Sequence, residues 1–223
     1  MSKGHVVITG AAGALGGAVC AHLAQAGWSV VAVDFSAHPL PACAVAEHWA
    51  DLASEAEAAR VFAAIAERAP PLAGLVNIAG GFAWETIADG AAETWDRLFR
   101  LNVKTALNAC RAALPHLADG AAIVNIGAAA AAKAEAGMGA YAASKAGVAR
   151  LTEALAAELK PRRIRANAIL PSIIDTPANR ADMPDADVSK WVTPQELAAV
   201  IGFLLSSDAS GVTGASIPVV GRV

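Results

Sequence analysis

The chain has 223 residues, which is enough for one well-formed core and short for two ordinary domains, so we expect a single domain over residues 1–223. Hydrophobic residues make up 56% of the chain and aromatic residues only 5%, which is typical of helices packed on a parallel sheet. The net charge is −3 and the lysines and arginines are scattered singly, which argues against a nucleic-acid-binding surface.

The sequence shows no targeting or metal-binding pattern. The first residues lack the features of a signal peptide, and no apolar run reaches the roughly 18 residues that cross a bilayer, so we expect a cytoplasmic protein without a membrane segment. Cys20, Cys43 and Cys110 are odd in number and widely spaced, which favours buried apolar side chains over a disulfide framework. The histidines show no paired-ligand spacing, and we expect no metal.

The first predicted element is an apolar strand at 6–8, followed by Gly10, Gly13 and Gly16 and a helix over 14–26. Glycine permits a sharp turn and carries no Cβ, so backbone N–H groups and the positive helix end can face a pyrophosphate. The spacing is Gly-x-x-Gly-x-x-Gly, whereas the usual dinucleotide fingerprint is Gly-x-Gly-x-x-Gly. The same residues are also compatible with a tight turn between a core strand and an alanine-rich helix.

A second apolar run over 29–33 ends at Asp34. In a dinucleotide-binding unit, a carboxylate about 20 residues after the glycines reaches the adenosine ribose hydroxyls and repels a 2′-phosphate. Asp34 therefore favours NAD over NADP. The alternative interpretation is an ordinary solvated aspartate in a loop.

Hydrophobic periodicity predicts alternating strands and helices along the rest of the chain. The further strands are expected at 45–50, 74–78, 121–126, 165–170 and 215–220, and the further helices at 53–68, 92–117, 140–160 and 195–205. The alanine-rich stretch 128–139 is either a mobile loop or a short helix, and the irregular polar segment 174–193 is interpreted as a substrate loop or lid. About seven strands interleaved with helices indicate an α/β fold, a doubly wound parallel sheet with helices on both faces.

Tyr141 is the single tyrosine of the chain, and Lys145 lies four residues later, on the same face of a helix. A nearby ammonium stabilises a phenolate and lowers the phenol pKa from its ordinary value near 10. Tyr141 could thus transfer a proton while a neighbouring nicotinamide transfers a hydride. As an isolated pair, a packed tyrosine and a solvated lysine would be the ordinary interpretation, but the position after the fifth strand favours catalysis.

Together these motifs resemble the short-chain dehydrogenase/reductase family over nearly the whole chain. The likeness is carried by the glycine segment 9–16, the Asn-Ile-Ala-Gly segment 77–80, Asn102 with Val103, Tyr141 with Lys145, and the segment 171–176. The resemblance implies a Rossmann-type fold and an NAD(P)-dependent oxidoreductase acting on a small carbonyl, alcohol or conjugated imine.

The resemblance also implies individual roles. Tyr141 would be the acid–base group, Lys145 would bind the ribose and tune Tyr141, and Asn102 would support the proton path. The cofactor would contact Gly10, Gly13, Leu15, Gly16, Asp34, Asp51, Leu52, Asn77, Ala79, Gly80, Tyr141, Lys145, Pro171, Ile173 and Thr176. Within this set, Asp51 and Leu52 would flank the adenine. Ile173 and Thr176 would contact the carboxamide and phosphates.

The chain departs from the family pattern at the place of a serine that usually stands 13 positions before the tyrosine, where it has Ala128. No serine or threonine occurs from 127 to 139 to replace it as a partner of the substrate oxygen. This departure, the glycine spacing and the segment 176–187 with Trp191 are similar to the dihydropteridine reductase branch of the family, which reduces a quinonoid pterin with NADH. A quinonoid pterin is therefore an alternative substrate.

Two further expectations follow from the resemblance and its departures. A catalytically inactive dinucleotide-binding sensor is an alternative of another class, while a serine hydrolase is disfavoured because the chain has no Gly-x-Ser-x-Gly elbow. The helices at 92–117 and 141–160 resemble those that pair into a four-helix interface in the family. We therefore expect a homodimer or homotetramer.

Overall fold

A parallel sheet of seven strands in the order β3-β2-β1-β4-β5-β6-β7 forms the centre of the computed structural model, which describes residues 3–35, 39–69 and 71–223. The strands are β1 (His5–Thr9), β2 (Ser29–Asp34), β3 (Ala46–Trp49), β4 (Leu72–Asn77), β5 (Leu117–Ile126), β6 (Arg165–Pro171) and β7 (Ser216–Val219). The chain runs outward from β1 to β3, returns past β1 to β4, and continues to β7. The strand order thus reverses between β1 and β4, where ligands bind in such sheets. The predicted doubly wound sheet is confirmed.

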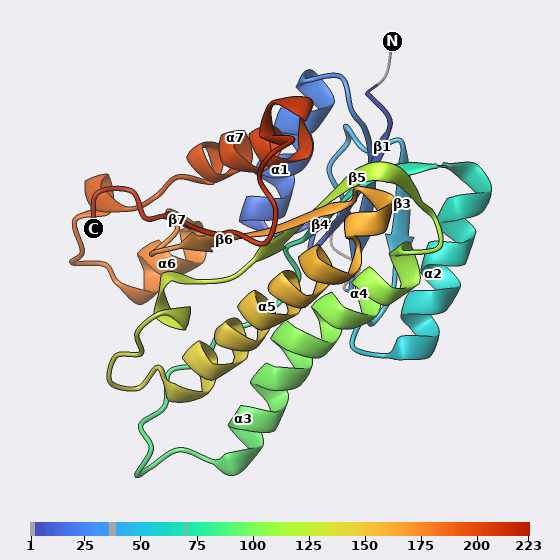
Figure 1. Cartoon of the computed structure of the whole chain (residues 1–223). Coiled ribbons are helices and arrows are strands. Elements are labelled where there is room, and N and C mark those ends of the chain that lie inside the picture. Colours follow the sequence, from blue (N-terminus) through green and yellow to red (C-terminus); the bar gives the residue numbers. More distant parts are fainter. Residues whose placement is uncertain (1–2, 36–38, 70) are drawn as a thin grey trace.

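Helices cover both faces of the sheet (Figure 1). One face carries α1 (Ala14–Gln25) and α7 (Pro194–Leu205), and the other carries α2 (Glu55–Arg68), α4 (Thr105–Ala113) and α5 (Gly139–Glu158). Because successive strand residues point to opposite faces, Val6 and Ile8 pack in the core with α1 and α7, whereas Val7 packs in the core with α2, α4 and α5. The apolar strands of the sequence are therefore buried on both sides.

The helix expected over 92–117 consists of three segments. They are α3 (Ala92–Leu98), a π-helical turn η1 (Phe99–Lys104) and α4, which ends at Ala113. Leu117 already belongs to β5 and pairs with Leu72 of β4, so the prediction was wrong for the last residues of this helix. Pro115 lies between the helix and the strand, where its ring prevents the helix from continuing.

The alanine-rich stretch 128–139 and the polar segment 174–193 both contain short helical turns. In 128–139 there is one 3₁₀ turn, η2 (Ala129–Ala131). The segment 174–193 contains α6 (Pro177–Asp182) and the 3₁₀ turn η4 (Val188–Lys190), and a parallel bridge between Ile174 and Val192 joins its two ends. The remaining 3₁₀ turns are η3 (Lys160–Arg162) and η5 (Ser207–Ala209).

Two of the three cysteines occupy the apolar environment that the sequence predicted. Cys20 and Cys110 are buried in the two core layers, but Cys43 is exposed, so the prediction was wrong for Cys43. Cys43 lies in the connection between β2 and β3, which belongs to neither core layer, so its side chain stays exposed. Within the described ranges of the chain, no helix combines the length and apolar character needed to span a bilayer.

Candidate functional site

The turn after β1 lies so close to the turn after β4 that two of its positions have no room for a side chain. Gly10 has φ +70°, and a Cβ there would lie 2.7 Å from the Ala79 nitrogen. A Cβ on Gly16 would overlap the carbonyl oxygen of Gly10. Thr9 Oγ1 joins the two turns by accepting hydrogen bonds from the backbone N–H groups of Ile78 and Ala79. Glycine at positions 10 and 16 is therefore a steric requirement.

A cavity of about 880 Å³ opens beside these turns at the carboxyl ends of β1 and β4. The N-cap of α1 is Gly13, which provides no side-chain hydrogen bond to the first helical turn. First-turn N–H groups without a cap form an anion-binding position at the positive end of the helix. This arrangement fits the pyrophosphate of a dinucleotide.

Ten of the residues predicted to bind the cofactor line this cavity: Gly10, Gly13, Leu15, Gly16, Asp34, Asp51, Leu52, Ala79, Gly80 and Thr176. The sequence interpretation missed twelve others: Ala12, Ala14, Phe35, Ala50, Ala53, Ile78, Arg97, Arg100, Leu101, Thr105, Pro177 and Ala178. Several of these are adjacent in sequence to a predicted residue, and that adjacency could have identified them as cavity-lining residues. Arg97 and Arg100 carried no such signal, because they come from the distant helix that contains Asn102.

The far end of the cavity carries two carboxylates with different partners. Asp34 accepts hydrogen bonds from the backbone N–H groups of Ala12 (2.9 Å) and Phe35 (2.7 Å), which fix its carboxylate at the end of β2. Asp51 accepts a hydrogen bond from Ala53 N and forms an ion pair with Arg100 at 2.8 Å. The position of Asp34 at the second strand end matches that of a carboxylate binding ribose hydroxyls.

Asn77 does not line the cavity, although the sequence suggested a cofactor contact. Its Nδ2 donates to Asn125 Oδ1 (2.9 Å) and to Cys110 Sγ (3.2 Å). Asn125 Nδ2 in turn donates to Thr152 Oγ1 on α5. The Asn77 side chain therefore connects β4, β5 and the helices behind the sheet, while the backbone after it continues to the cavity.

Asn102 lies on the π-helical turn η1 and is also absent from the cavity lining. Its amide binds both backbone groups of Gly81, with Oδ1 accepting from the N–H and Nδ2 donating to the carbonyl. Nδ2 also donates to Ser144 Oγ on α5. Asn102 thereby holds the loop after β4 against the first turns of α5, where Tyr141 lies.

Tyr141 and Lys145 share one face of α5, and neither residue belongs to the lining of the cavity. The Lys145 Nζ donates to the Ile126 carbonyl at 2.9 Å and would lie 3.5 Å from a Cβ placed on Gly80. It lies 5.9 Å from the centre of the Tyr141 ring. The structure thus brings together the pair predicted to perform the chemistry and one of the glycines predicted to contact the cofactor.

The pKa values of this pair are set mainly by burial. Burial raises the pKa of Tyr141 to about 12 and lowers the pKa of Lys145 to about 8. The direction for Tyr141 is opposite to the lowering that the sequence suggested. The physical reason is that the phenol is largely removed from water, while the Lys145 amine lies near the ring face and is bound to a carbonyl.

Four residues singled out from the sequence lie at or shortly after the ends of β5 and β6. Ala128 is buried immediately after β5, so no hydroxyl is present at that position. Pro171 ends β6 and is buried in the sheet. The Ile173 carbonyl accepts a hydrogen bond from Val192 N, while Thr176 caps α6 and lines the cavity.

Comparison with known proteins identifies the family. A family model described as short chain dehydrogenase matches residues 4–187. The chain belongs to the short-chain dehydrogenase/reductase family. This family consists of oxidoreductases that bind nicotinamide dinucleotides, which agrees with the cavity and its uncapped helix N-terminus.

The relatives of this short-chain dehydrogenase/reductase extend over nearly all of its length. A 2-(R)-hydroxypropyl-CoM dehydrogenase from Xanthobacter autotrophicus is 31% identical, over 95% of this chain and 94% of the relative. A short-chain type dehydrogenase/reductase from Mycobacterium ulcerans has a solved structure with a TM-score of 0.91 and 28% identity, covering 100% of this chain and 90% of that one. A blue fluorescent protein from a metagenomic library, solved in complex with NADPH, has a TM-score of 0.88 and 27% identity over 99% of this chain and 98% of that one.

Proposed function

We propose that this protein is an NAD-dependent reductase of small carbonyl or conjugated imine compounds, with Tyr141 as its proton donor. The proposal rests on Gly80, which lines the edge of the cavity and which Lys145 approaches. Lys145 also shares a helix face with Tyr141, so the proposed proton donor lies close to the position proposed for the dinucleotide. The other end of the cavity presents Asp34, which favours NAD over NADP because its charge repels a 2′-phosphate.

A bound reduced nicotinamide supplies the hydride for such a reaction. The Tyr141 hydroxyl donates its proton to the substrate oxygen or nitrogen, which leaves a phenolate on the protein. Lys145 faces the ring and stabilises that phenolate while its ammonium is charged, below its pKa of about 8. Asn102 keeps Gly81 and the start of α5 in fixed positions during this transfer.

The pKa of Tyr141 favours the reductive direction. With a pKa of about 12 the phenol is protonated at neutral pH, which is the state that a proton donor needs. Oxidation of an alcohol would require the phenolate and should become faster as the pH rises. Reduction at neutral pH is therefore the direction in which the role of Tyr141 is best tested.

The Tyr141→Phe variant tests the proposal. We expect it to lose turnover of butane-2,3-dione by about 100-fold or more, because the hydroxyl that supplies the proton is removed, and to retain NADH binding, because the aromatic ring stays in place. Turnover is measured as NADH oxidation, and affinity by NADH fluorescence titration. Full turnover by the Tyr141→Phe variant would disprove the assigned role.

Ala128 supports two alternatives. One is reduction of a quinonoid pterin, in which conjugation spreads the developing charge and reduces the need for a second donor. The other is a dinucleotide-binding sensor without catalysis, because the buried Ala128 offers no hydroxyl to the substrate oxygen. Turnover of quinonoid dihydropterin supports the first. NADH binding without turnover, together with turnover gained by Ala128→Ser, supports the second.

We also propose a homodimer or homotetramer that forms through the helices α3 to α5. Trp95 and Phe99 are 44% and 50% exposed on α3 and η1, which is a large apolar area for helices of a soluble monomer. Light scattering coupled to size exclusion chromatography measures the mass directly. A monomer at micromolar concentration would disprove this proposal.

A further inference from the structure

An aromatic side chain contacts the proposed proton donor directly. The Phe82 and Tyr141 ring centroids are 4.9 Å apart with the planes at 78°, an edge-to-face pair. Phe82 follows Gly81, whose backbone N–H and carbonyl are both hydrogen-bonded to the Asn102 side chain. Its side chain is nevertheless 56% exposed. Phe82 thus provides an apolar side chain in contact with the Tyr141 ring, and much of its surface is available to a ligand.

A second aromatic side chain lies two residues further along the same loop. The Trp84 Nε1 donates to the Ala136 carbonyl at 3.1 Å, and the indole packs on Gly137, where a Cβ would overlap the ring. Gly137 has φ +75°, and its carbonyl accepts a hydrogen bond from Glu85 N. The indole is therefore fixed in place, yet it is 60% exposed. A side chain ordered before binding loses little conformational entropy on contact with a ligand.

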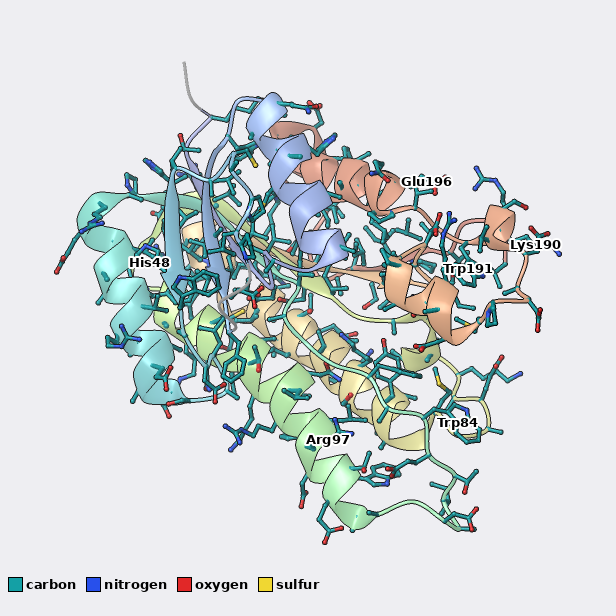
Figure 2. The ribbon with its side chains drawn as sticks, turned by 180° about the vertical axis from the view of Figure 1, so that it is seen from behind. His48, Trp84, Arg97, Lys190, Trp191 and Glu196 are labelled. Carbon is teal, nitrogen blue, oxygen red and sulfur yellow. The ribbon has the colours of Figure 1, made fainter. Side chains whose placement is uncertain are left out.

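The opposing segment provides apolar contacts and few polar ones. From 127 to 139 the chain contains only glycine, alanine and methionine apart from Lys133 and Glu135, both of which are exposed. The half-buried Met138 adds a polarisable thioether immediately before α5. Trp84 and the segment 174–193, which contains Lys190 and Trp191, lie at the same end of the molecule (Figure 2). Apolar walls with one converging polar group are typical of a site for a small ligand.

We propose that the substrate carries a planar aromatic group next to its reacting carbonyl or imine, and that Phe82 and Trp84 bind this group. The inference rests on the proposed function for the position of the reacting atom. The binding site for the aromatic group depends only on the geometry of the loop that carries Phe82 and Trp84. The reacting atom lies at the Tyr141 hydroxyl, and the ring extends along Phe82 toward Trp84. An aliphatic substrate of the same chemistry leaves both side chains in water.

Two diketones that differ only in one substituent test this proposal. We expect wild-type protein to prefer 1-phenylpropane-1,2-dione to butane-2,3-dione, mainly through a lower KM. Phe82→Ala and Trp84→Ala should each reduce the ratio of the two kcat/KM values by about tenfold, as loss of an aromatic contact does. Trp84→Phe should keep most of the preference, because it retains an aromatic ring. Steady-state NADH oxidation gives all these ratios.

Phe203→Ala is the matched control, since Phe203 is a 45% exposed aromatic residue on α7, away from this loop. It should leave both kcat/KM values unchanged. Equal loss on the two diketones in Trp84→Ala, or no preference in the wild type, would overturn the proposal. If no diketone is turned over, calorimetric binding of 1-phenylpropane-1,2-dione decides the question. If Trp84→Ala binds this diketone more weakly than wild type does, Phe82 and Trp84 form an aromatic-binding site even though the proposed function has failed. If the two proteins bind it equally, or neither binds it, the proposed aromatic-binding site is refuted.

Discussion

The proposed cofactor end and the proposed substrate end of this site are built in different ways. At the cofactor end, the essential features are backbone positions: Gly10 and Gly16 allow two turns to touch, and Gly13 leaves the start of α1 uncapped. At the substrate end, side chains hold together segments that are distant in sequence. Asn102, for example, is hydrogen-bonded both to Gly81 and to α5. A site built from backbone tolerates few substitutions, whereas one built from side chains can be altered one contact at a time.

Gly16→Ala is expected to have the largest effect at the cofactor end. The added Cβ would overlap the Gly10 carbonyl, and because the obstacle is backbone it cannot move aside. We expect the dissociation constant of NADH to rise by about 100-fold or more, with a lower unfolding temperature, because the first turn of α1 must shift away from the pyrophosphate position. Fluorescence titration and thermal unfolding measure the two effects.

Gly17→Ala is the neighbouring control. A Cβ at Gly17 meets nothing within 4 Å, so this variant should bind NADH normally and gain about 0.5–1 kcal/mol in unfolding free energy from helix propensity. If Gly16→Ala bound NADH as well as Gly17→Ala, the steric account of the glycine turn would be wrong.

This contrast also explains what the sequence revealed. The glycine turn and Asp34 are encoded by local spacing, and both lie in the cavity as expected. The pKa of Tyr141 was expected in the wrong direction, because its burial depends on packing between segments far apart in the chain. Arg100 was missed for the same reason: its partner Asp51 is 49 residues away in sequence. Helix periodicity likewise gives no sign of the π-helical turn that positions Asn102.

Lys145→Met tests the cost of the buried charge at the substrate end. Lys145 is only 6% exposed, and burial lowers its pKa to about 8. At pH 7 its buried charge therefore lowers the free energy of unfolding by roughly 3 kcal/mol. Between pH 8 and the ordinary lysine value the unfolded chain binds more protons, so wild-type stability should rise with pH in that range. Lys145→Met should be more stable than wild type at pH 7 and should lose that advantage by about pH 10.

Urea unfolding at several pH values measures this difference. Above pH 10 the raised pKa of Tyr141 acts in the opposite direction, because the folded protein then retains the phenolic proton longer, so the comparison belongs below that pH. Lys104→Met, at an exposed lysine of η1, is the matched control and should keep the pH profile of the wild type. A pH-independent difference between Lys145→Met and wild type would contradict the buried-charge account.

Asp34→Ala tests cofactor choice and should have an intermediate effect. Removal of the carboxylate removes both a ribose hydrogen-bond acceptor and the repulsion of a 2′-phosphate. We expect weaker NADH binding and stronger NADPH binding, and so a fall of about tenfold or more in the ratio of the two affinities. Paired fluorescence titrations give the ratio. The cofactor proposal fails if wild-type protein binds NADPH as tightly as NADH.

Arg100→Ala should have the smallest effect, because its ion pair with Asp51 is largely solvated. The side chains of Arg100 and Asp51 are 60% and 29% exposed, and such pairs contribute about 0–1 kcal/mol. Loss of Arg100 removes one of the two contacts that hold the Asp51 carboxylate, which we propose lies at the adenine, so we expect NADH affinity to fall about two- to fivefold and the effect to shrink in high salt.

Nicotinamide mononucleotide separates the two ends of the cavity in this test, since it has no adenine to reach Asp51. Its affinity should be unchanged in Arg100→Ala. Arg111→Ala removes a similarly exposed pair with Glu55 that does not line the cavity, and it should leave both ligands unaffected. Equal losses for the mononucleotide and for NADH would place the influence of Arg100 on the substrate end, through the π-helical turn that it shares with Asn102.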